Sequence, residues 1–342
     1  MIGVDISDRS VKMVRLRHKK DAHDLVGACL QEIPEDVIND GVIQDKDGMR
    51  EILKELFAAC KVPLNTKDQV VASVPEAQSF LRVVDLPRIP EDEIGEAVQW
   101  EVAQHIPFGL ENVYIDWQTL GGGHRAASGH QEILVGAAQR KVVDSLFSVL
   151  SGMRLDVAAL ELESQALVRT LVSPELREKQ GILLIDLGGA STNVVIHDHG
   201  AIRFTASLER GSDRMRQMLS QEELEGLREH AQEMTAQNRA NVEAKLRGLY
   251  EELVVEVNGV VEFYNSIDVQ HKVREIILTG GGSSWPGLPA VFLRMFEQVH
   301  IQQGNPWATI LSRQQSLHSP MSQSDSVRYT TAIGLALRPV VQ

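Results

Sequence analysis

An aspartate within an apolar run, followed by a turn rich in glycine and hydroxyl residues, is the first feature of this sequence that indicates chemistry. Asp186 interrupts the apolar residues 182–187, which predict a buried strand, in the segment GILLIDLGGASTNVVIHD. The next residues include Gly188, Gly189, Ser191 and Thr192. A buried carboxylate needs a partner, and hydrated Mg²⁺ suits it. Because a glycine turn lets backbone N–H groups approach an anion, we expect a β-hairpin that binds a metal-bound phosphate; an ordinary hairpin is the alternative.

A second copy of this pattern stands near the N-terminus, in the segment IGVDISDRSVKMV at residues 2–14. Asp5 aligns with Asp186, and Ser10 aligns with Ser191. The two copies lie about half a chain apart, as an internal duplication places them. Two such hairpins, facing each other, would enclose a polyphosphate, and the two aspartates would hold Mg²⁺ through water. Lys12 projects from the returning strand, where we expect it to be solvated; a contact with phosphate is the alternative.

A third element is the segment IILTGGGSSWPGL at residues 276–288. An apolar strand leads into the residues Gly280, Gly281, Gly282 and Ser283. Consecutive glycines let the backbone lie flat against a planar group such as a purine, and a following helix N-terminus favours an anion. We therefore expect this turn to flank adenosine. A tight strand-to-helix turn without a ligand is the alternative.

Composition and charge restrict the classes of function. The chain has 342 residues, of which 43% are apolar and 24% charged, and this allows two soluble domains of ordinary size. Its formal net charge of −13 disfavours non-specific binding to nucleic acid and to anionic membranes. No GxxxxGK[ST] motif occurs, so a P-loop enzyme is excluded.

The cysteines and the hydropathy pattern indicate the compartment. Cys29 and Cys60 have no CxxC spacing, so neither a disulfide scaffold nor a zinc site is supported, and a reducing compartment fits. No run of 18 apolar residues occurs, and the chain begins in a strand pattern without a signal peptide. We expect a cytoplasmic protein that does not insert into the membrane and associates with it through a partner.

The pattern of helices and strands predicts two domains and an insertion. The first domain is expected to comprise residues 1–75 and 139–180, and the inserted subdomain residues 76–138. The second domain is expected to comprise residues 181–342, with 213–265 as its charge-rich helical subdomain.

The order of two aspartate hairpins and a glycine-rich turn resembles the actin-like ATPase superfamily. The sequence is similar to one branch nearly end to end, the PilM family of type IV pilus assembly. Besides the three motifs, the resemblance rests on LPRIPEDEIGEAVQWEVAQHIPFGLENVYIDWQ at 86–118, VVEFYNSID at 260–268 and TTAIGLALR at 330–338. It implies an α/β, actin-like (ribonuclease H-like, duplicated) two-domain ATPase fold with an inserted subdomain of the FtsA/PilM type.

The resemblance implies that ATP or ADP with Mg²⁺ binds between the two halves. Asp5 and Asp186 would hold the hydrated metal, and the turn residues named above would bind phosphate. In the first turn, Ser7, Asp8 and Arg9 replace the small glycine-containing turn that is common in actin-like proteins. Arg9 would contact a phosphate or narrow the pocket. The protein is expected to be at most a slow ATPase, and the sequence identifies no catalytic residue.

The resemblance also implies a partner. The cleft between the insert and the first domain would hold the short cytoplasmic N-terminal peptide of PilN, which belongs to the PilN/PilO inner-membrane complex. The candidate contact residues are Trp100, His105, Ile106, Pro107 and Phe108. The alternative for each is a place in the insert's own core. Contact with pilus motor ATPases and self-association remain open. The alternative functions are a small-molecule kinase of the sugar-kinase type and a nucleotide-free passive adaptor.

Overall fold

The computed structural model describes residues 1–18, 23–60, 68–104, 106, 108–120, 129–173, 176, 181–229, 235–267, 272–308, 310 and 321–339. Within these ranges, no helix combines the length and the apolar character needed to cross a bilayer.

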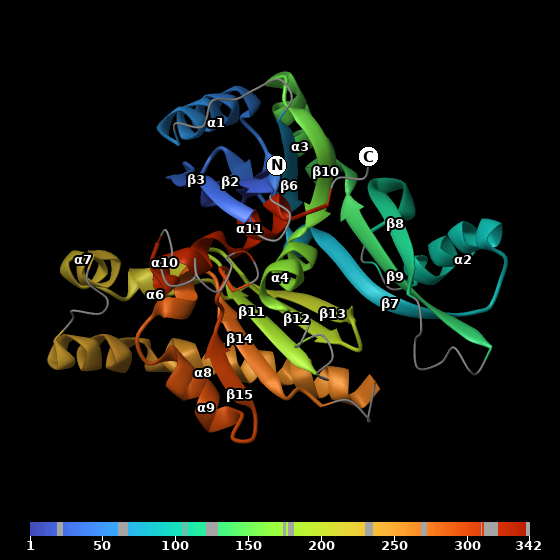
Figure 1. The fold of residues 1–342 in the computed structure, drawn as a ribbon. Coiled ribbons are helices and arrows are strands. Elements are labelled where there is room, and N and C mark those ends of the chain that lie inside the picture. Colours follow the sequence, from blue (N-terminus) through green and yellow to red (C-terminus); the bar gives the residue numbers. More distant parts are fainter. Residues whose placement is uncertain are drawn as a thin grey trace.

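Two sheets repeat one strand order, and this repetition is the basis of the fold (Figure 1). The first sheet contains β1 (Ile2–Ile6), β2 (Ser10–His18), β3 (His23–Glu32), β6 (Gln69–Val74) and β10 (Asp156–Leu162), in the order β10-β6-β1-β2-β3. The second contains β11 (Ile182–Leu187), β12 (Thr192–Asp198), β13 (Ala201–Leu208), β14 (Glu275–Thr279) and β15 (His300–Gln303), in the matching order β15-β14-β11-β12-β13. In both, the first three strands are antiparallel and the other two are parallel to the first. The duplication inferred from the two aspartate hairpins therefore extends over ten strands.

The insert extends the second sheet. Its strands are β7 (Ser79–Pro87), β9 (His130–Gln139) and β8 (Val113–Leu120), and they continue the order after β13. The junction is narrow, because β13 pairs with β7 at Phe204 and Arg82. Helix α2 (Glu91–Ala103) covers one face of these strands with Ile94, Val98 and Val102. Figure 1 shows the insert as a lateral projection that connects to both domains.

Each of the remaining helices belongs to one of the two domains. On the first domain they are α1 (Lys46–Ala59) and α3 (Arg140–Gly152), beside the small hairpin of β4 (Ile38–Asn39) and β5 (Val42–Ile43). On the second they are α6 (Ser212–Gln217), α7 (Gln221–Glu229), α8 (Ala236–Ile267) and α9 (Leu288–Met295), followed by α10 (Gln323–Ser326). Helix α1 begins at Asp45, whose carboxylate accepts bonds from the N–H groups of Asp47 and Gly48. Its buried face consists of Met49, Leu53, Leu56 and Phe57.

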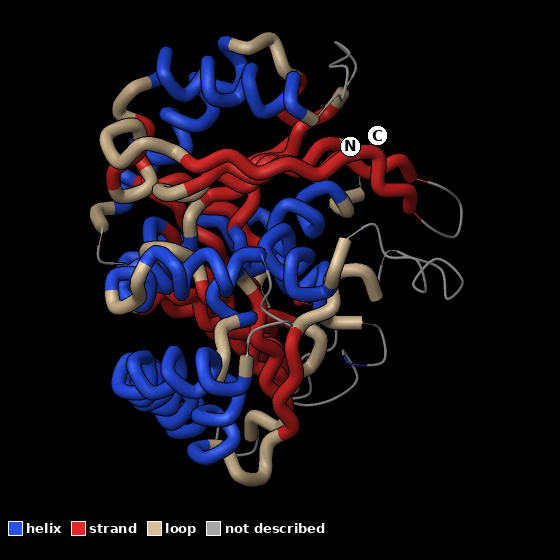
Figure 2. Tube along the Cα trace, turned by 90° about the vertical axis from the view of Figure 1, so that its left-hand side faces the viewer, coloured by secondary structure: helices blue, strands red, loops and turns tan. Residues whose placement is uncertain are grey.

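Two helices join the domains at the centre of the molecule. Helix α4 (Glu163–Leu171) follows β10, and α11 (Thr330–Ala336) is the last helix in the described part of the chain. Although they are far apart in the sequence, the two helices pack against each other. A Cβ on Gly334 would stand 2.0 Å from the carbonyl oxygen of Ala166, so the helix backbones touch there. Helix α11 also packs on the first sheet, where Ile333 lies with Val14 and Leu16. Figure 1 shows α4 and α11 between the two groups of strands, and Figure 2 shows helices between an upper and a lower group of strands.

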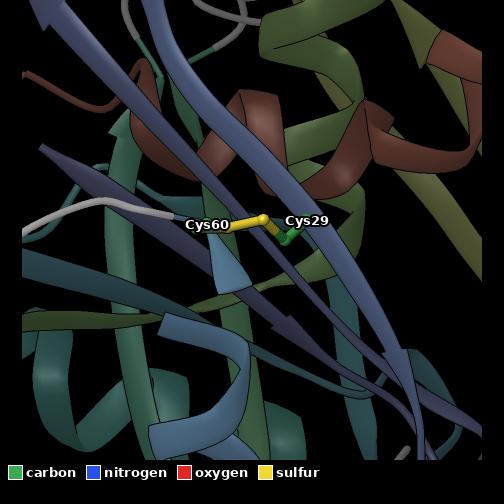
Figure 3. The surroundings of a disulfide bond; sticks show 2 residues. All are labelled: Cys29 and Cys60. Atoms are coloured by element: carbon green, nitrogen blue, oxygen red, sulfur yellow. A yellow bond between two sulfur atoms is a disulfide. The ribbon is translucent and has the colours of Figure 1, made fainter. Parts of the chain in front are cut away.

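The two cysteines are paired, contrary to the sequence analysis, which gave them no partner. Cys29 on β3 and Cys60 at the end of α1 form a disulfide with a Cα–Cα distance of 5.7 Å (Figure 3). The sequence spacing gives no sign of this bond, because the two cysteines are 31 positions apart and only the packing of α1 on the sheet brings them together.

Candidate nucleotide site and partner groove

The first aspartate hairpin places a carboxylate and an ammonium group side by side. Asp5 and Lys12 are register partners on β1 and β2, and the Lys12 Nζ–Asp5 Oδ2 distance is 2.9 Å. Ser73 Oγ donates to the other oxygen of Asp5 at 3.1 Å. The expectation that Lys12 is a solvated strand lysine is wrong, because its side chain is largely buried against Asp5.

The second hairpin repeats this geometry with different chemistry. Asp186 on β11 is the register partner of Asn193 on β12, seven residues later, as Asp5 is of Lys12. The Asn193 amide donates to Glu163 Oε2 at 2.7 Å and accepts a bond from Ser207 at 2.9 Å. Lys12 and Asn193, which occupy aligned positions in the two hairpins, therefore each donate to a carboxylate, that of Asp5 and that of Glu163 respectively.

Glu163 is a candidate site residue that the sequence analysis missed. It is buried at the start of α4, directly after β10, and accepts bonds from the Asn193 side chain and from the backbone N–H of Glu76 at 3.2 Å. Glu76 in turn accepts the N–H of Ser164 at 3.2 Å. These groups follow the carboxyl ends of parallel strands, where ligands bind in open α/β sheets. The available signal was a pair of acidic residues, Glu161 and Glu163, in the otherwise largely apolar segment 157–168.

The electrostatics of the site are dominated by an excess of negative charge. Burial, followed by the charges of Asp5 and Asp186, raises the pKa of Glu163 well above its usual range. Burial also raises the pKa of Asp186 to about 6; Lys12 opposes this shift and Asp5 adds to it. Burial disfavours the Lys12 ammonium, but Asp5 outweighs this effect, and the pKa of Lys12 is raised. One ammonium thus faces three carboxylates.

The first turn is held by its own side chains. The Ser7 N–H and hydroxyl both donate to the Ser10 carbonyl at 3.0 Å. Asp8 points away from the second hairpin and accepts the N–H of Gly41 at 3.0 Å; burial, partly opposed by this bond, raises its pKa. The Arg9 side chain extends towards the second domain, where its Nε lies 2.9 Å from Asp213.

The second turn also uses several groups internally. The Gly188 N–H donates to the Ser191 carbonyl at 3.0 Å, and the buried Thr192 hydroxyl donates to the Arg210 carbonyl. Gly189 lies beside Arg9, because a Cβ on Gly189 would stand 3.2 Å from Arg9 Cγ. The two turns therefore approach each other across the domain boundary, as the duplication predicts.

The glycine-rich turn packs against the second hairpin. A Cβ on Gly280 would stand 2.2 Å from Asp186 Oδ1, and one on Gly282 would stand 2.9 Å from the Leu187 side chain. Only a glycine fits Gly280, which also has a φ of 82°. The buried Ser283 hydroxyl donates to the Gly280 carbonyl at 2.8 Å. Gly281 has more room, since its Cβ would meet only Arg328, at 3.8 Å.

These residues fit a magnesium-bound nucleotide. The charge imbalance of the three carboxylates and Lys12 suits a divalent cation. Gly280 lies close to Asp186, so the turn expected at adenosine is next to the carboxylate expected to hold the metal. Within the described ranges, no three acidic, histidine or cysteine side chains are grouped to coordinate an ion directly. Asp5 and Asp186 would accordingly hold the ion through its water shell.

A groove of about 820 Å³ lies where the insert meets both domains. Its lining comes from β8 and β9 of the insert, from β10 and α4 of the first domain, and from His197, Gly200, Ala201 and Ile202 of the second domain, together with Arg338 and Pro339. Apolar walls come from Leu81, Leu134 and Val168. At its base, the buried Glu161 binds Arg169 and Arg338, the latter at 3.0 Å. Both β8 and β10 contribute residues to its lining, and both are terminal strands of their sheets (Figure 1).

The residues nominated for the partner peptide lie elsewhere on the insert. Trp100 is 71% exposed on α2, whereas Ile106 is buried and Phe108 half-buried in the core beneath that helix. None of these three lines the groove. His105 and Pro107 lie outside the described residues. A peptide contact at Trp100 stays a prediction, separate from the groove.

Comparisons with known proteins agree with the fold and the sequence motifs. A solved structure described as "PilM-PilN type IV pilus biogenesis complex" has a TM-score of 0.81 and 22% identity, covering 100% of this chain and 98% of that chain. Ethanolamine utilization protein EutJ from Carboxydothermus hydrogenoformans has a TM-score of 0.56 and 16% identity, covering 98% and 88%. The expected mixed α/β, actin-like fold is confirmed. The family model described as "Type IV pilus assembly protein PilM" matches residues 3–340, and the chain therefore belongs to the PilM family of type IV pilus assembly proteins.

Proposed function

We propose that this protein is a nucleotide-responsive scaffold of type IV pilus assembly. It binds ATP or ADP with Mg²⁺ between its two domains, and it holds the cytoplasmic N-terminal segment of a PilN-type protein in the groove beside the insert. Membership of the PilM family and the similarity to a PilM–PilN complex support this partner. In this proposal the protein works in the cytoplasm and reaches the inner membrane through the PilN/PilO complex.

The observation that carries the proposal is that one continuous segment serves both sites. Leu160, Glu161 and Leu162 of β10 line the groove, the next residue is Glu163 of the carboxylate cluster, and α4 then returns Val168 and Arg169 to the groove. A shift of α4 that follows a change at Glu163 must also reshape the groove wall. A packed element of this kind transmits a population shift between two sites.

Each part of the nucleotide site has a separate task in this proposal. Asp5 and Asp186 orient the hydrated ion, and Lys12 balances their charge and attracts phosphate. Magnesium would neutralise the phosphate charge when bound. Glu163 is the carboxylate placed to orient a water molecule, which allows at most slow hydrolysis.

The groove suits an extended peptide better than a small molecule. Its two terminal strands, β8 and β10, offer backbone groups for pairing, and its apolar walls offer pockets for alternate side chains. The family match over residues 3–340 likewise favours an assembly scaffold over a small-molecule kinase.

Calorimetric titration tests both parts of the proposal on one protein. Mg²⁺–ATP, and then a synthetic peptide of the PilN N-terminus, are titrated into the wild type and into three variants. Asp186→Ala should lose ATP and keep the peptide. Gly136→Leu should keep ATP and lose the peptide, because its Cβ would have ordinary 3.5 Å and 3.6 Å contacts and its side chain would fill the groove. Trp100→Ala should bind both ligands normally.

The remaining outcomes separate the alternatives. Peptide binding without any ATP binding would identify a nucleotide-free passive adaptor. Loss of the peptide in Trp100→Ala, with normal binding in Gly136→Leu, would move the partner site from the groove to the outer face of α2.

A further inference from the structure

Arg9 forms a side-chain bridge between the two phosphate turns. Its Nε lies 2.9 Å from Asp213 Oδ2, although the two residues are 204 positions apart and belong to different domains. Its aliphatic stem lies against Gly189, since a Cβ on that glycine would stand 3.2 Å from Arg9 Cγ and 3.3 Å from the Asp213 carboxylate. Arg9, Gly189 and Asp213 therefore converge at the tips of the two turns.

Asp213 is fixed to the second turn by the backbone. The Asp213 N–H donates to the Gly189 carbonyl at 3.0 Å, and the Ser212 N–H donates to the Gly188 carbonyl at 2.9 Å. The carboxylate thus moves with the turn that is expected to bind phosphate. Whatever attracts Arg9 away from Asp213 changes how the first turn is tied to the second domain.

The Arg9–Asp213 pair is weak enough to be exchanged. The two side chains are 42% and 29% exposed, and solvent-exposed ion pairs contribute little net stability. The second partner of Arg9, Glu35, is 86% exposed at 2.8 Å and holds it no more firmly. A phosphate group carries more charge than a carboxylate and accepts two parallel N–H bonds from a guanidinium, so it competes well for this side chain.

We infer that Arg9 is a phosphate-responsive latch that binds Asp213 across the cleft and transfers to the terminal phosphate of a nucleoside triphosphate. This inference rests on the proposed nucleotide site. The base is expected at Gly280–Gly282, and the two turns enclose the far end of the phosphate chain. A diphosphate, which lacks that last group, leaves Arg9 on Asp213. Arg9 therefore makes the site select triphosphate over diphosphate.

The test compares the affinities for a non-hydrolysable ATP analogue and for ADP, each with Mg²⁺. Arg9→Ala should weaken binding of the analogue about tenfold, the size expected for a lost charged hydrogen bond, and should change ADP binding less than about threefold. Asp213→Asn should strengthen binding of the analogue, because the competing carboxylate is gone. The double variant should behave like Arg9→Ala. Arg214→Gln is the matched control, since Arg214 lies beside Asp213 on α6 but faces Glu252 at 3.7 Å.

A second readout needs no nucleotide. If Arg9 and Asp213 are paired across the cleft, the effects of Arg9→Ala and Asp213→Asn on the free energy of unfolding should not add in a double-mutant cycle. If Arg9→Ala weakens the binding of the ATP analogue and of ADP equally, or changes neither affinity, the proposed role of Arg9 is wrong while the nucleotide site itself still stands. A wild type that binds neither nucleotide would instead refute the proposed nucleotide site and the latch with it.

Discussion

At Asp186, the charge that would bind a metal ion also lowers the stability of the ligand-free protein. Its carboxyl has a raised pKa, about 6, because it is buried beside Asp5. In the unfolded chain this carboxyl ionises near pH 4, whereas in the folded protein it ionises only near pH 6. Above pH 6 the ionised carboxylate therefore destabilises the folded state relative to the unfolded chain, and protonation at lower pH removes this cost. Its contribution therefore favours folding at pH 4 and is lost as the pH rises through 6.

We predict that Asp186→Asn is more stable than the wild type at pH 7.5 without nucleotide, yet binds Mg²⁺–ATP at least about tenfold more weakly. The amide removes one of three negative charges around Lys12, and the ion loses one carboxylate. Thermal denaturation between pH 5 and 7.5 checks the first part, because the stability advantage of the variant should shrink towards pH 5. A variant that is less stable than the wild type throughout this range would contradict the charge argument.

Glu163 supports a second prediction at the same scale. Its Oε2 is held by Asn193 and by the Glu76 N–H, which leaves the other oxygen to orient water. Glu163→Gln should therefore keep nucleotide affinity within about threefold and reduce any slow hydrolysis about a hundredfold or more. Phosphate release in single-turnover assays measures this. Unchanged hydrolysis in Glu163→Gln would exclude a catalytic role for the residue.

Sequence reasoning at the residue scale succeeded where a motif occurs twice. Asp5 and Asp186 each interrupt an apolar run, and the structure places them at the same position of two matching hairpins. Their role in binding a metal stays a prediction. It failed for Lys12, because strand alternation does not reveal which polar side chain has a buried acid opposite. Glu163 was missed for a related reason. Its strand–helix junction has no glycine-rich turn, and only the tertiary structure brings it to the two hairpins.

At the scale of elements, the contact between α4 and α11 depends on Gly334. A Cβ there would overlap the backbone carbonyl of Ala166 at 2.0 Å, and a backbone atom cannot move aside as a side-chain end does. We predict that Gly334→Ala lowers the free energy of unfolding by about 1–3 kcal/mol through overpacking. Gly248→Ala on α8 is the matched control, because a Cβ there meets nothing within 4 Å and should be neutral or stabilising. Urea denaturation monitored by circular dichroism compares the two, and equal effects would refute the argument.

The disulfide joins elements that are already packed together. It closes a loop of about 31 residues, for which chain-entropy estimates give a stabilisation of about 3–4 kcal/mol. We predict that a reductant lowers the urea midpoint of the wild type and leaves that of the Cys29→Ser/Cys60→Ser variant unchanged. Thiol titration of the unreduced, denatured protein provides the control. Two titratable thiols in that sample would show that the bond is not formed.

Element boundaries followed from local sequence wherever a local signal exists. Asp45 caps the N-terminus of α1, and Pro90 precedes the acidic first turn of α2, and both residue types favour the start of a helix. The sequence pattern did not predict that α11 would return to the first sheet, or that β7 would extend the second. Both depend on contacts between residues far apart in the chain, such as Phe204 with Arg82, which no periodicity encodes.

At the scale of the whole molecule, helix α4 contacts both the second domain and the groove. Asn193 of the second domain binds Glu163 at the start of this helix, and the rest of the helix forms part of the groove wall. Closure of the domains on a nucleotide would act on α4 through this bond. The peptide affinity should then differ between nucleotide states.

The coupling must be reciprocal, and this makes it measurable. If ATP changes the peptide affinity by some factor, the peptide must change the ATP affinity by the same factor, because both follow from one thermodynamic cycle. We predict a factor of about 5 or more in the wild type, the lower end of typical allosteric coupling. Asn193→Ala should bind both ligands but bring the factor close to 1, since the bond between the second domain and α4 is removed. Titrations of each ligand, with and without saturating amounts of the other, determine all four affinities. A wild-type factor of 1 would mean that the two sites share a helix without communicating through it.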